Sequence, residues 1–424
     1  MRLLFILLLL SLNLSSQKRD LEYYLNQATN NSLLINTAKN DNKTIQLDLQ
    51  SVKAMLSKPL IDIESNILFA PIISHENNTY KFNLISDDAN MYNGYDLAYS
   101  DGGQYQAFLS LKQSLFRGKT YKKYIEQVGI QTKLNNNKIE LSKHELKQLV
   151  SLQYMLCLMA KKQSEISKSL LDKLNKHLVR MQELVKENIY EQTDLMLMQI
   201  ETENTNIEYK TFLMNYYENL FELNILCGIK DTNIVDIEDI NINIENKAVI
   251  NSEFINRFKF DSLNVIANQS IFENKYRPQV DIFINTGMYA IYLPSINRFG
   301  FATGVNFSWN IFDGNQKKIQ NQKSYIELQN IEFEKKNFIK QRDINKEKYL
   351  NKIHALDKQI EITQNQLDQY NKLIALYKID LSKGKLSIMD LKNLIRDVSA
   401  KKQENLSLQI QEQMLIIYYN YWDY

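Results

Sequence analysis

Side chains suited to catalysis or metal binding are few and scattered along this sequence of 424 residues. The stretch HELKQ, which begins at His144, lacks the second histidine of a zinc protease motif, and the sequence contains no glycine-rich phosphate-binding loop. Cys157 and Cys227 lie 70 residues apart and indicate no disulfide framework. Metal-ligand spacing is also absent among the four histidines, which are His75, His144, His177 and His354. We therefore expect a protein that is not an enzyme and that binds no cofactor or metal.

Two carboxylates, Asp194 and Asp390, occupy equivalent places 196 residues apart. Each falls in the first turn of a predicted helix, where a carboxylate stabilises the positive end of the helix dipole by about 0.3–1 kcal/mol. Ser387 and Asp390 also have the spacing of a capping box. Helix capping is therefore the simplest role for both carboxylates, and any second role depends on the elements that hold them.

The composition favours long helices. Only 4 Pro and 11 Gly occur in the chain, so few residues interrupt a helix. The 51 Lys and Arg residues nearly balance 49 Asp and Glu residues, which gives a formal net charge of +2. A charge this balanced does not favour nucleic acid as a partner.

The N-terminal stretch MRLLFILLLLSLNLSSQ has the layout of a secretory signal peptide, which we place at residues 1–16. Arg2 precedes an apolar run that ends at Leu10, and small polar residues follow. A hydrophobic segment of a cytosolic protein is the alternative interpretation. The run is too short to span a bilayer and no later stretch of 18 apolar residues occurs, so a membrane location would require strands.

Two pairs of strands are indicated by the prolines and by alternating side chains. Pro59 and Pro71 bracket one apolar run, Pro278 and Pro294 bracket another, and a second strand follows each run. Residues 299–311 alternate strictly between an apolar face and a small, polar face. The apolar face comprises Phe299, Phe301, Thr303, Val305, Phe307, Trp309 and Ile311. A sheet with one face on a soluble core would give the same alternation.

Two segments without proline, 119–185 and 315–381, follow the strand pairs, and each is long enough for one helix of roughly 100 Å. A seam with coiled-coil spacing runs through the second segment. Its members are Ile353, Leu356, Ile360, Thr363, Leu367, Tyr370, Ile374, Tyr377 and Leu381. Subtracting 196 gives a matching seam from Cys157 to Val185 without a gap. Cys157 is therefore best interpreted as a small packing residue.

The repeated order of strand, strand, long helix, turn and shorter helix divides the mature chain into two repeats. We predict a first repeat over 17–228, an equatorial linker over 229–252 and a second repeat over 253–424. Each repeat begins with a helix. The further predicted elements are strands 59–70 and 105–116 with a helical hairpin over 119–227, and strands 278–290 and 299–311 with a helical hairpin over 315–422.

Four strands with two open edges cannot lie alone in lipid, because each unpaired backbone group costs several kcal/mol. Two copies of the chain would give eight strands around a filled interior, whereas three copies of four strands give twelve around an open lumen. The small, polar face of residues 299–311 favours the lumen and hence a trimer. The first connection between strands, about 72–103, is long, and such loops usually face the cell exterior. Trp309, Tyr289 and Tyr292 form a candidate interfacial aromatic girdle, with ordinary sheet packing as the alternative.

The chain resembles the TolC-like outer-membrane efflux channels over nearly its whole mature length. The resemblance rests on the duplicated order of elements, the corners SLFRG and NIFDG, and the tips NIYEQTDLM and GKLSIMDLK. It implies a mostly α-helical fold with transmembrane β-strands, in which a trimeric 12-stranded β-barrel continues into a periplasmic α-helical coiled-coil tunnel. It also implies an outer-membrane exit duct for efflux or type I secretion. The implied partners are a periplasmic adaptor (membrane fusion protein), an inner-membrane transporter and outer-membrane lipid.

The resemblance further implies roles for residues near the two tips. In this family, rings of carboxylates near the second tip line the periplasmic constriction, and an arginine in that tip helps to lock the closed state. Position 386 holds leucine where the family has this arginine, and the second ring position holds Asn393, so we expect a weaker cation block. The candidate gate residues are Asp390, Asn393, Asp194 and Lys385. The candidate adaptor contacts, which are otherwise simple turn residues, are Asn188, Ile189, Thr193, Gly384, Leu386 and Ser387.

A periplasmic coiled-coil adaptor or tether without a pore is the alternative function. Such a protein needs one hairpin and compact β domains, whereas this sequence predicts two hairpins and two strand pairs. The sequence therefore favours a passive exit duct, and it leaves the cargo open among drugs, metals, dyes and proteins.

Overall fold

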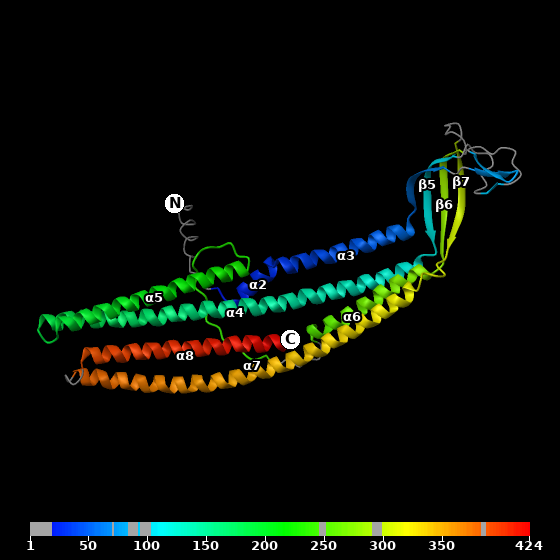
Figure 1. The fold of residues 1–424 in the computed structure, drawn as a ribbon. Helices are drawn as coiled ribbons and strands as arrows, with labels where there is room; N and C mark the ends of the chain where they lie inside the picture. Colours follow the sequence, from blue (N-terminus) through cyan, green and yellow to red (C-terminus); the bar gives the residue numbers. More distant parts are fainter. Residues whose placement is uncertain are drawn as a thin grey trace, which may run out of the picture. The chain divides into compact units, whose positions relative to one another are not determined.

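The computed structural model describes residues 19–69, 72–83, 92–93, 103–245, 252–290, 299–382 and 387–424. The predicted signal peptide lies outside these residues. Helices form most of the described chain, and antiparallel strands form the remaining regular structure (Figure 1). The chain divides into two compact units. Unit 1 comprises residues 1–40, 136–258 and 333–424, and unit 2 comprises residues 41–135 and 259–332.

A four-stranded sheet in unit 2 contains both predicted strand pairs (Figure 1). Its strands, in spatial order, are β1 (Leu60–Phe69), β5 (Gly103–Leu115), β6 (Gln279–Ala290) and β7 (Phe299–Ser308). All neighbours are antiparallel, and β5 pairs with β6 to join the two repeats. β1 and β7 are the edges of this sheet: in the described part of the chain, β1 pairs only with β5 and β7 pairs only with β6, so the outer edge of each has no partner strand.

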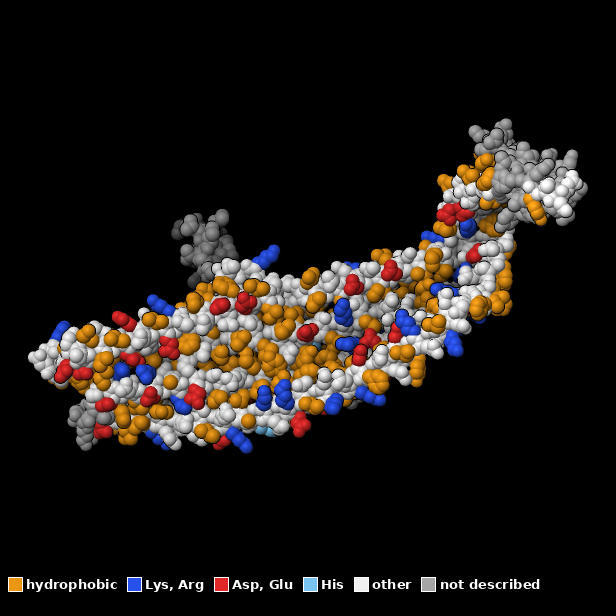
Figure 2. Space-filling model, viewed as in Figure 1, with side chains coloured by type: hydrophobic (Ala, Val, Ile, Leu, Met, Phe, Trp, Pro, Cys, Tyr) orange, Lys and Arg blue, Asp and Glu red, His pale blue; other side chains and the backbone are white. Residues whose placement is uncertain are grey.

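One face of this sheet is apolar across all four strands. Residues directly opposite one another in an antiparallel pair point to the same face. The register places Leu109 opposite both Ile63 and Thr286, and it places Thr286 opposite Phe301. Ile63 is 85% exposed and Phe301 is 81% exposed, and hydrophobic side chains of the sheet reach the surface in Figure 2. The predicted apolar stripe is therefore exposed in this chain, and it is not packed on a core of the same chain.

The opposite face of the sheet carries polar groups and small residues. Ser110 Oγ donates to Asn285 Oδ1 at 2.8 Å across β5 and β6. The ring of Phe283 lies over Gly304, where a Cβ atom would come within 2.6 Å of the ring. Tyr289 lies opposite Gln106 on this polar face. Tyr289 therefore does not belong to the apolar surface proposed as a girdle, and Tyr292 lies outside the described residues.

A second, small sheet occupies part of the first connection, for which the sequence predicts only a long loop. Its order is β3 (Thr79–Asn83), β2 (Ile72–Glu76) and β4 (Tyr92–Asn93). Asn77 and Asn78 join β2 to β3 with φ angles of 48° and 61°. Asparagine tolerates the left-handed backbone that a two-residue hairpin turn of this kind requires.

The two corners between sheet and helix are similar in sequence but differ in backbone conformation. In the first corner Phe116 has a φ angle of 59°, whereas in the second Gly314 and Asn315 have φ angles of 68° and 69°. A bulky aromatic residue rarely adopts the left-handed region, so the first corner holds strain that the second avoids. The two corners are therefore equivalent in sequence position but not in backbone conformation.

Eight segments of helix account for the rest of the regular structure of the described residues. The helix that begins the first repeat is divided in two at Ser32, and the two long helices that follow the strand pairs have 69 and 67 residues. No helix in the described ranges combines the length and the apolarity needed to cross a membrane. The helices are α2 (Leu21–Asn31), α3 (Leu33–Ser57), α4 (Gly118–Lys186), α5 (Gln192–Leu226), α6 (Glu253–Phe272), the 3₁₀ helix η2 (Glu273–Tyr276), α7 (Gln316–Ser382) and α8 (Ile388–Trp422).

In unit 1, α4 with α5 and α7 with α8 form the two helical hairpins (Figure 1). The seam residues of both long helices lie on buried sides, with Leu174 at 0% and Leu367 at 5% exposure. Cys157 is fully buried, and burial raises the pKa of its thiol to about 12. A thiol in this environment stays protonated, as a packing residue should.

The core of unit 1 is built from aromatic and aliphatic side chains of α2, α4, α5 and α8 together with the linker. Tyr154 Oη donates to the carbonyl of Glu238 at 2.7 Å, and Tyr216 Oη donates to the carbonyl of Val235 at 2.7 Å. Gly228, with a φ angle of 65°, ends α5 because the N–H of Ile229 returns to the carbonyl of Asn224 at 2.8 Å. These contacts hold the linker against the middle of the first hairpin.

Candidate functional site

The tips of the two hairpins in unit 1 hold nearly all the predicted site residues. At the first tip, Asn188 has a φ angle of 59°, and the N–H of Ile189 donates to the carbonyl of Leu184 at 2.9 Å. This closure is a Schellman motif with asparagine at the left-handed position. Asn188 therefore ends α4 as the turn chemistry predicts. At the second tip Gly384, Lys385 and Leu386 lie outside the described residues, and their roles stay predictions.

A complete capping box begins α8. Ser387 Oγ accepts the backbone N–H of Asp390 at 3.1 Å, and Asp390 Oδ2 accepts the backbone N–H of Ser387 at 3.1 Å and its hydroxyl at 2.8 Å. These hydrogen bonds from Ser387 hold the pKa of the Asp390 carboxyl below its usual value. Ser387 and Asp390 therefore cap α8 through hydrogen bonds within one copy of the chain.

The start of α5 uses a looser version of the same arrangement. Asp194 Oδ2 accepts the backbone N–H of Glu191 at 3.4 Å, and Thr193 Oγ1 donates to Glu191 Oε2 at 3.2 Å. Asp194 is half-buried, whereas Thr193 is exposed. Both equivalent aspartates thus cap the helices that leave the tips.

An apolar cluster beneath the tips joins the two hairpins. Tyr190, which packs on this cluster, accepts the backbone N–H of Ile388 through its hydroxyl oxygen at 3.1 Å. This bond links the first tip to the start of α8 and satisfies an N–H that the helix itself leaves unpaired. The buried members of the cluster are Leu170, Leu174, Met181, Leu195, Met198, Ile388, Leu391 and Ile395.

A charged contact two turns below the tip also joins α5 to α8. Glu201 lies 3.9 Å from Lys392 Nζ and 3.6 Å from an Arg396 guanidinium nitrogen. The side chains of Glu201 and Lys392 are 17% and 10% exposed, so their charges are poorly screened. This contact was not predicted from the sequence. The four-residue spacing of Lys392 and Arg396, which places two cations on one face of α8, was the available signal.

The remaining predicted tip residues are accessible to solvent. Ile189 is 60% exposed, and Asn188, Asp390 and Asn393 are also exposed. An exposed isoleucine on a tight turn is available for contact with another molecule. Within the described residues, no group of three or more His, Cys, Asp or Glu side chains is placed to hold a metal ion.

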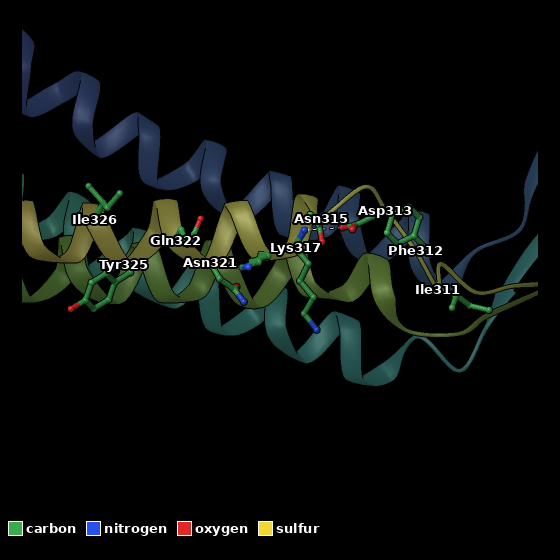
Figure 3. A pocket seen from close by; sticks show the side chains of 10 residues that line it. Ile311, Phe312, Asp313, Asn315, Lys317, Asn321, Gln322, Tyr325 and Ile326 are labelled. Atoms are coloured by element: carbon green, nitrogen blue, oxygen red, sulfur yellow. Dashed lines mark hydrogen bonds between the residues drawn. The ribbon is translucent and has the colours of Figure 1, made fainter.

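The second corner of unit 2 forms a hollow of about 840 Å³ where β7 leads into α7 (Figure 3). Ile311 and Phe312 lie on its border and are 82% and 79% exposed. Asp313 Oδ2 accepts the backbone N–H of Lys317 at 2.8 Å and a hydrogen bond from the hydroxyl of Tyr276, so its charge is used in starting α7. The hollow is an open, amphipathic surface next to an edge strand.

Comparison with known proteins identifies the fold. The sequence matches no protein-family model, and no curated protein matches it. Among solved structures, the channel CusC aligns with a TM-score of 0.70 at 12% identity over 96% of this chain and 92% of that one. The outer membrane protein VceC from Vibrio cholerae aligns with a TM-score of 0.67 at 11% identity over 95% of both chains. MtrE from Neisseria gonorrhoeae, an outer membrane channel in its open state, aligns with a TM-score of 0.65 at 11% identity over 95% of this chain and 88% of that one.

This chain has the fold of the outer membrane channels.

The comparison agrees with two sequence predictions, the mostly helical fold and the resemblance to outer-membrane channels. The resemblance to TolC-like channels is confirmed as a resemblance of fold, since the alignments cover nearly the whole of this mostly helical chain. The alignments cover 95–96% of this chain, so they include most of the four-stranded sheet and of the two hairpins. Identity near 11–12% carries no further information on residue roles.

Proposed function

We propose that this protein is an outer-membrane exit duct through which an inner-membrane transporter exports its cargo. The observation that carries the proposal is the sheet of unit 2, which has one exposed apolar face and, among the described residues, two edges without a partner strand. An apolar face of this kind is stable against lipid, whereas its edges require further strands. The channels with the same fold are outer membrane proteins, which supports the same location for this chain.

Three copies provide the missing strands. If β1 of one copy pairs with β7 of the next, three sheets of four strands close into twelve and no edge is left open. The polar face, with Ser110, Asn285 and Gly304, then lines a lumen. The exposed surface around Ile311 and Phe312 beside β7 lies where the next copy or the lipid boundary would cover it. The homotrimer, the 12-stranded barrel and the coiled-coil tunnel are all part of this proposal.

The hairpin tips form the periplasmic gate in this proposal. Asp390, Asp194 and Asn393 surround the entrance when copies assemble about a threefold axis, and repulsion between the three Asp390 carboxylates favours a bound cation. The contact of Glu201 with Lys392 and Arg396 holds α8 against α5 and keeps the entrance narrow. Lys385 belongs to the gate only as a prediction from the sequence.

Docking of a periplasmic adaptor at the tips connects the duct to its pump. In this proposal the adaptor contacts four residues that the structure describes. Three lie at the first tip, Asn188, Ile189 and Thr193, and one lies at the second, Ser387. Gly384 and Leu386 complete the predicted contact surface from the sequence. The protein itself performs no chemistry and acts as a passive path, while the transporter selects the cargo.

Conductance in planar lipid bilayers tests the proposal. The full-length protein, purified in detergent, should migrate as a trimer and should give discrete channels that are blocked by divalent cations from the periplasmic side. Protein that stays monomeric without detergent and never gives channels would contradict the duct and would favour the tether that spans the periplasm without a pore.

A further inference from the structure

A cavity of about 560 Å³ opens between α4, the end of α8 and linker residues 240–245 in unit 1. Its volume falls within the range of about 300–1,000 Å³ in which proteins hold small organic ligands. Part of its lining is apolar, with Leu21 at 7% and Ile417 at 5% exposure. Ile240 and Ile242 of the linker add to this apolar part. The cavity therefore has the size of a ligand site, and its polar groups decide which ligand fits.

The linker wall of the cavity is held in place by side chains of α8. Gln413 Oε1 accepts the backbone N–H of Ile242 at 2.6 Å. Asn420 accepts the backbone N–H of Glu245 at 2.9 Å and donates to the carbonyl of Asn243 at 2.9 Å. These three hydrogen bonds fix the linker across α8, so the cavity is formed before a ligand binds.

Stacked rings form another wall of the cavity. The rings of His144 and Tyr424 are nearly parallel, with centroids 3.8 Å apart, and those of His144 and Tyr421 are nearly parallel at 5.0 Å. His144 Nε2 lies 2.9 Å from the carbonyl oxygen of Tyr421, which fixes the orientation of the imidazole. All three residues line the cavity, so rigid aromatic surface lies beside its apolar part.

The charged side chains at the cavity have partners of opposite charge. Lys143 Nζ lies 2.8 Å from Glu140 Oε1, and Lys147 Nζ lies 3.3 Å from Glu245 Oε1. Glu245 also lines the cavity, so positive and negative charge are both present there. Paired charges of this kind give little preference for an ionic ligand.

Two polar side chains of α4 line the cavity without a hydrogen-bond partner in the described part of the chain. Ser151 is 2% exposed, and Gln148 lies one turn before it on the same helix. A buried hydroxyl normally has a hydrogen-bond partner, so Ser151 indicates a polar group supplied from within the cavity. Asn241 of the linker adds a further amide to the lining.

The sequence repeat does not account for these polar residues. At the offset of 196, Gln148 corresponds to Ile344 of α7, and Ser151 corresponds to Glu347. The packing that the two hairpins have in common therefore requires neither an amide nor a hydroxyl at these positions.

We propose that this cavity binds a neutral, N-acetylated sugar of one or two rings. Hydroxyl and amide groups of the sugar pair with Ser151, Gln148 and Asn241, each of which can both donate and accept. The C–H face of a sugar ring packs on the aromatic wall at Tyr424, and an acetyl methyl group packs beside Ile417. A pure hydrocarbon would leave the hydroxyl and the amides unpaired, and an ion would meet charges that are already paired. The inference goes beyond export and does not depend on the proposed duct.

Binding of N,N′-diacetylchitobiose to the full-length protein tests the inference. The protein is purified in a polyoxyethylene detergent, because a detergent with a sugar head group would compete for the cavity. Saturation-transfer NMR and calorimetry measure binding, and the matched probe is the glucosamine dimer, in which positive charges replace the acetyl groups. The acetylated sugar should bind at least about tenfold more tightly than the matched probe. Gln148→Leu with Ser151→Ala should weaken its binding by about tenfold, because two hydrogen bonds are lost.

A matched control separates the cavity from general effects of the substitutions. Gln182→Leu with Ser169→Ala makes the same chemical change at exposed positions of α4 outside the cavity and should leave sugar binding unchanged. Asn241→Ala changes an exposed linker position with little risk to folding and should weaken binding by about threefold.

Three results would overturn the inference: no binding of diacetylchitobiose, equal binding of the two probes, or equal loss of binding in the two double variants. None of these measurements uses conductance, so the sugar site and the duct can fail separately.

Discussion

The hydroxyl oxygen of Tyr190, at the tip of the first hairpin, accepts the backbone N–H of Ile388, the first residue of α8, at 3.1 Å. The two residues are 198 positions apart. This bond and the apolar cluster beneath it tie together two tips that must separate if the entrance of a duct is to widen.

Replacing Tyr190 with phenylalanine should loosen the link between the tips. The N–H of Ile388 then loses its acceptor while the ring keeps its packing, and the lost hydrogen bond lowers folding stability by about 0.5–1.5 kcal/mol. We expect faster hydrogen exchange at the start of α8 and a higher open probability in bilayers. Tyr377→Phe is the control, because Tyr377 packs against the same cluster. Equal effects of the two variants would show that the Tyr190 bond has no special role.

Neutralising Glu201 should also weaken the contact that holds the two tips together. Glu201→Gln leaves Lys392, which is 10% exposed, without its neighbouring carboxylate, and an uncompensated charge of this kind costs about 1–3 kcal/mol. Channel open probability should rise and the tip should become sensitive to protease. Adding Lys392→Met should restore much of the stability, because the buried charge is then removed. A double variant as open as Glu201→Gln alone would contradict this explanation.

The two roles of Asp390 can be separated by substitution. Ser387→Ala removes a capping acceptor and should destabilise the start of α8 by about 1 kcal/mol without altering cation block. Asp390→Asn keeps an acceptor for the Ser387 N–H but removes the charge, so it should weaken block by divalent cations more than it lowers the melting temperature. Unchanged block in Asp390→Asn would leave capping as the sole role of this residue.

The two faces of the sheet should differ sharply in their tolerance of charge. Phe301→Asp places a carboxylate on the exposed apolar face, where contact with lipid would destabilise the inserted strand. We expect loss of membrane insertion and of the trimer, seen by fractionation and by gel migration without heating. Ala302→Asp, one residue along on the polar face, is the matched control and should insert normally. Normal insertion of Phe301→Asp would refute lipid contact at this face.

The stability of the first hairpin near its tip should fall in mild acid. Burial with Lys378 and Arg180 lowers the pKa of His177 in the folded state, while an unfolded histidine titrates near about 6.5. The unfolded state therefore binds more protons as the pH falls below about 6.5, and folding loses stability in that range. Hydrogen-exchange protection in the last turns of α4, corrected for the slower intrinsic exchange of amides in acid, should fall from pH 7.5 to 5.5. His177→Gln should remove this loss of protection, whereas the control His354→Gln, at an exposed site on α7, should retain it.

Much of the fold was predictable because its signals are local. Proline brackets and strict alternation located the strands near 60–69 and 299–308, and the lack of proline located the long helices. The turn at Asn188 and the capping box of Ser387 and Asp390 were also predictable, because turns and caps depend on residues a few positions apart. The small sheet of β2, β3 and β4 was missed because its strands are short and carry little periodicity.

The sequence by itself determined the four strands of the larger sheet, the long helices, the caps at the tips, and the offset of 196 residues that relates the two hairpins. Only the tertiary structure decided that β5 pairs with β6, that Tyr190 meets Ile388, and that Glu201 faces Lys392. Backbone conformation depends mainly on neighbours within a few residues, so it can be predicted from short stretches of the sequence. Contacts across more than 150 residues are chosen from many partners of similar chemistry, and that choice is made by packing the whole unit at once.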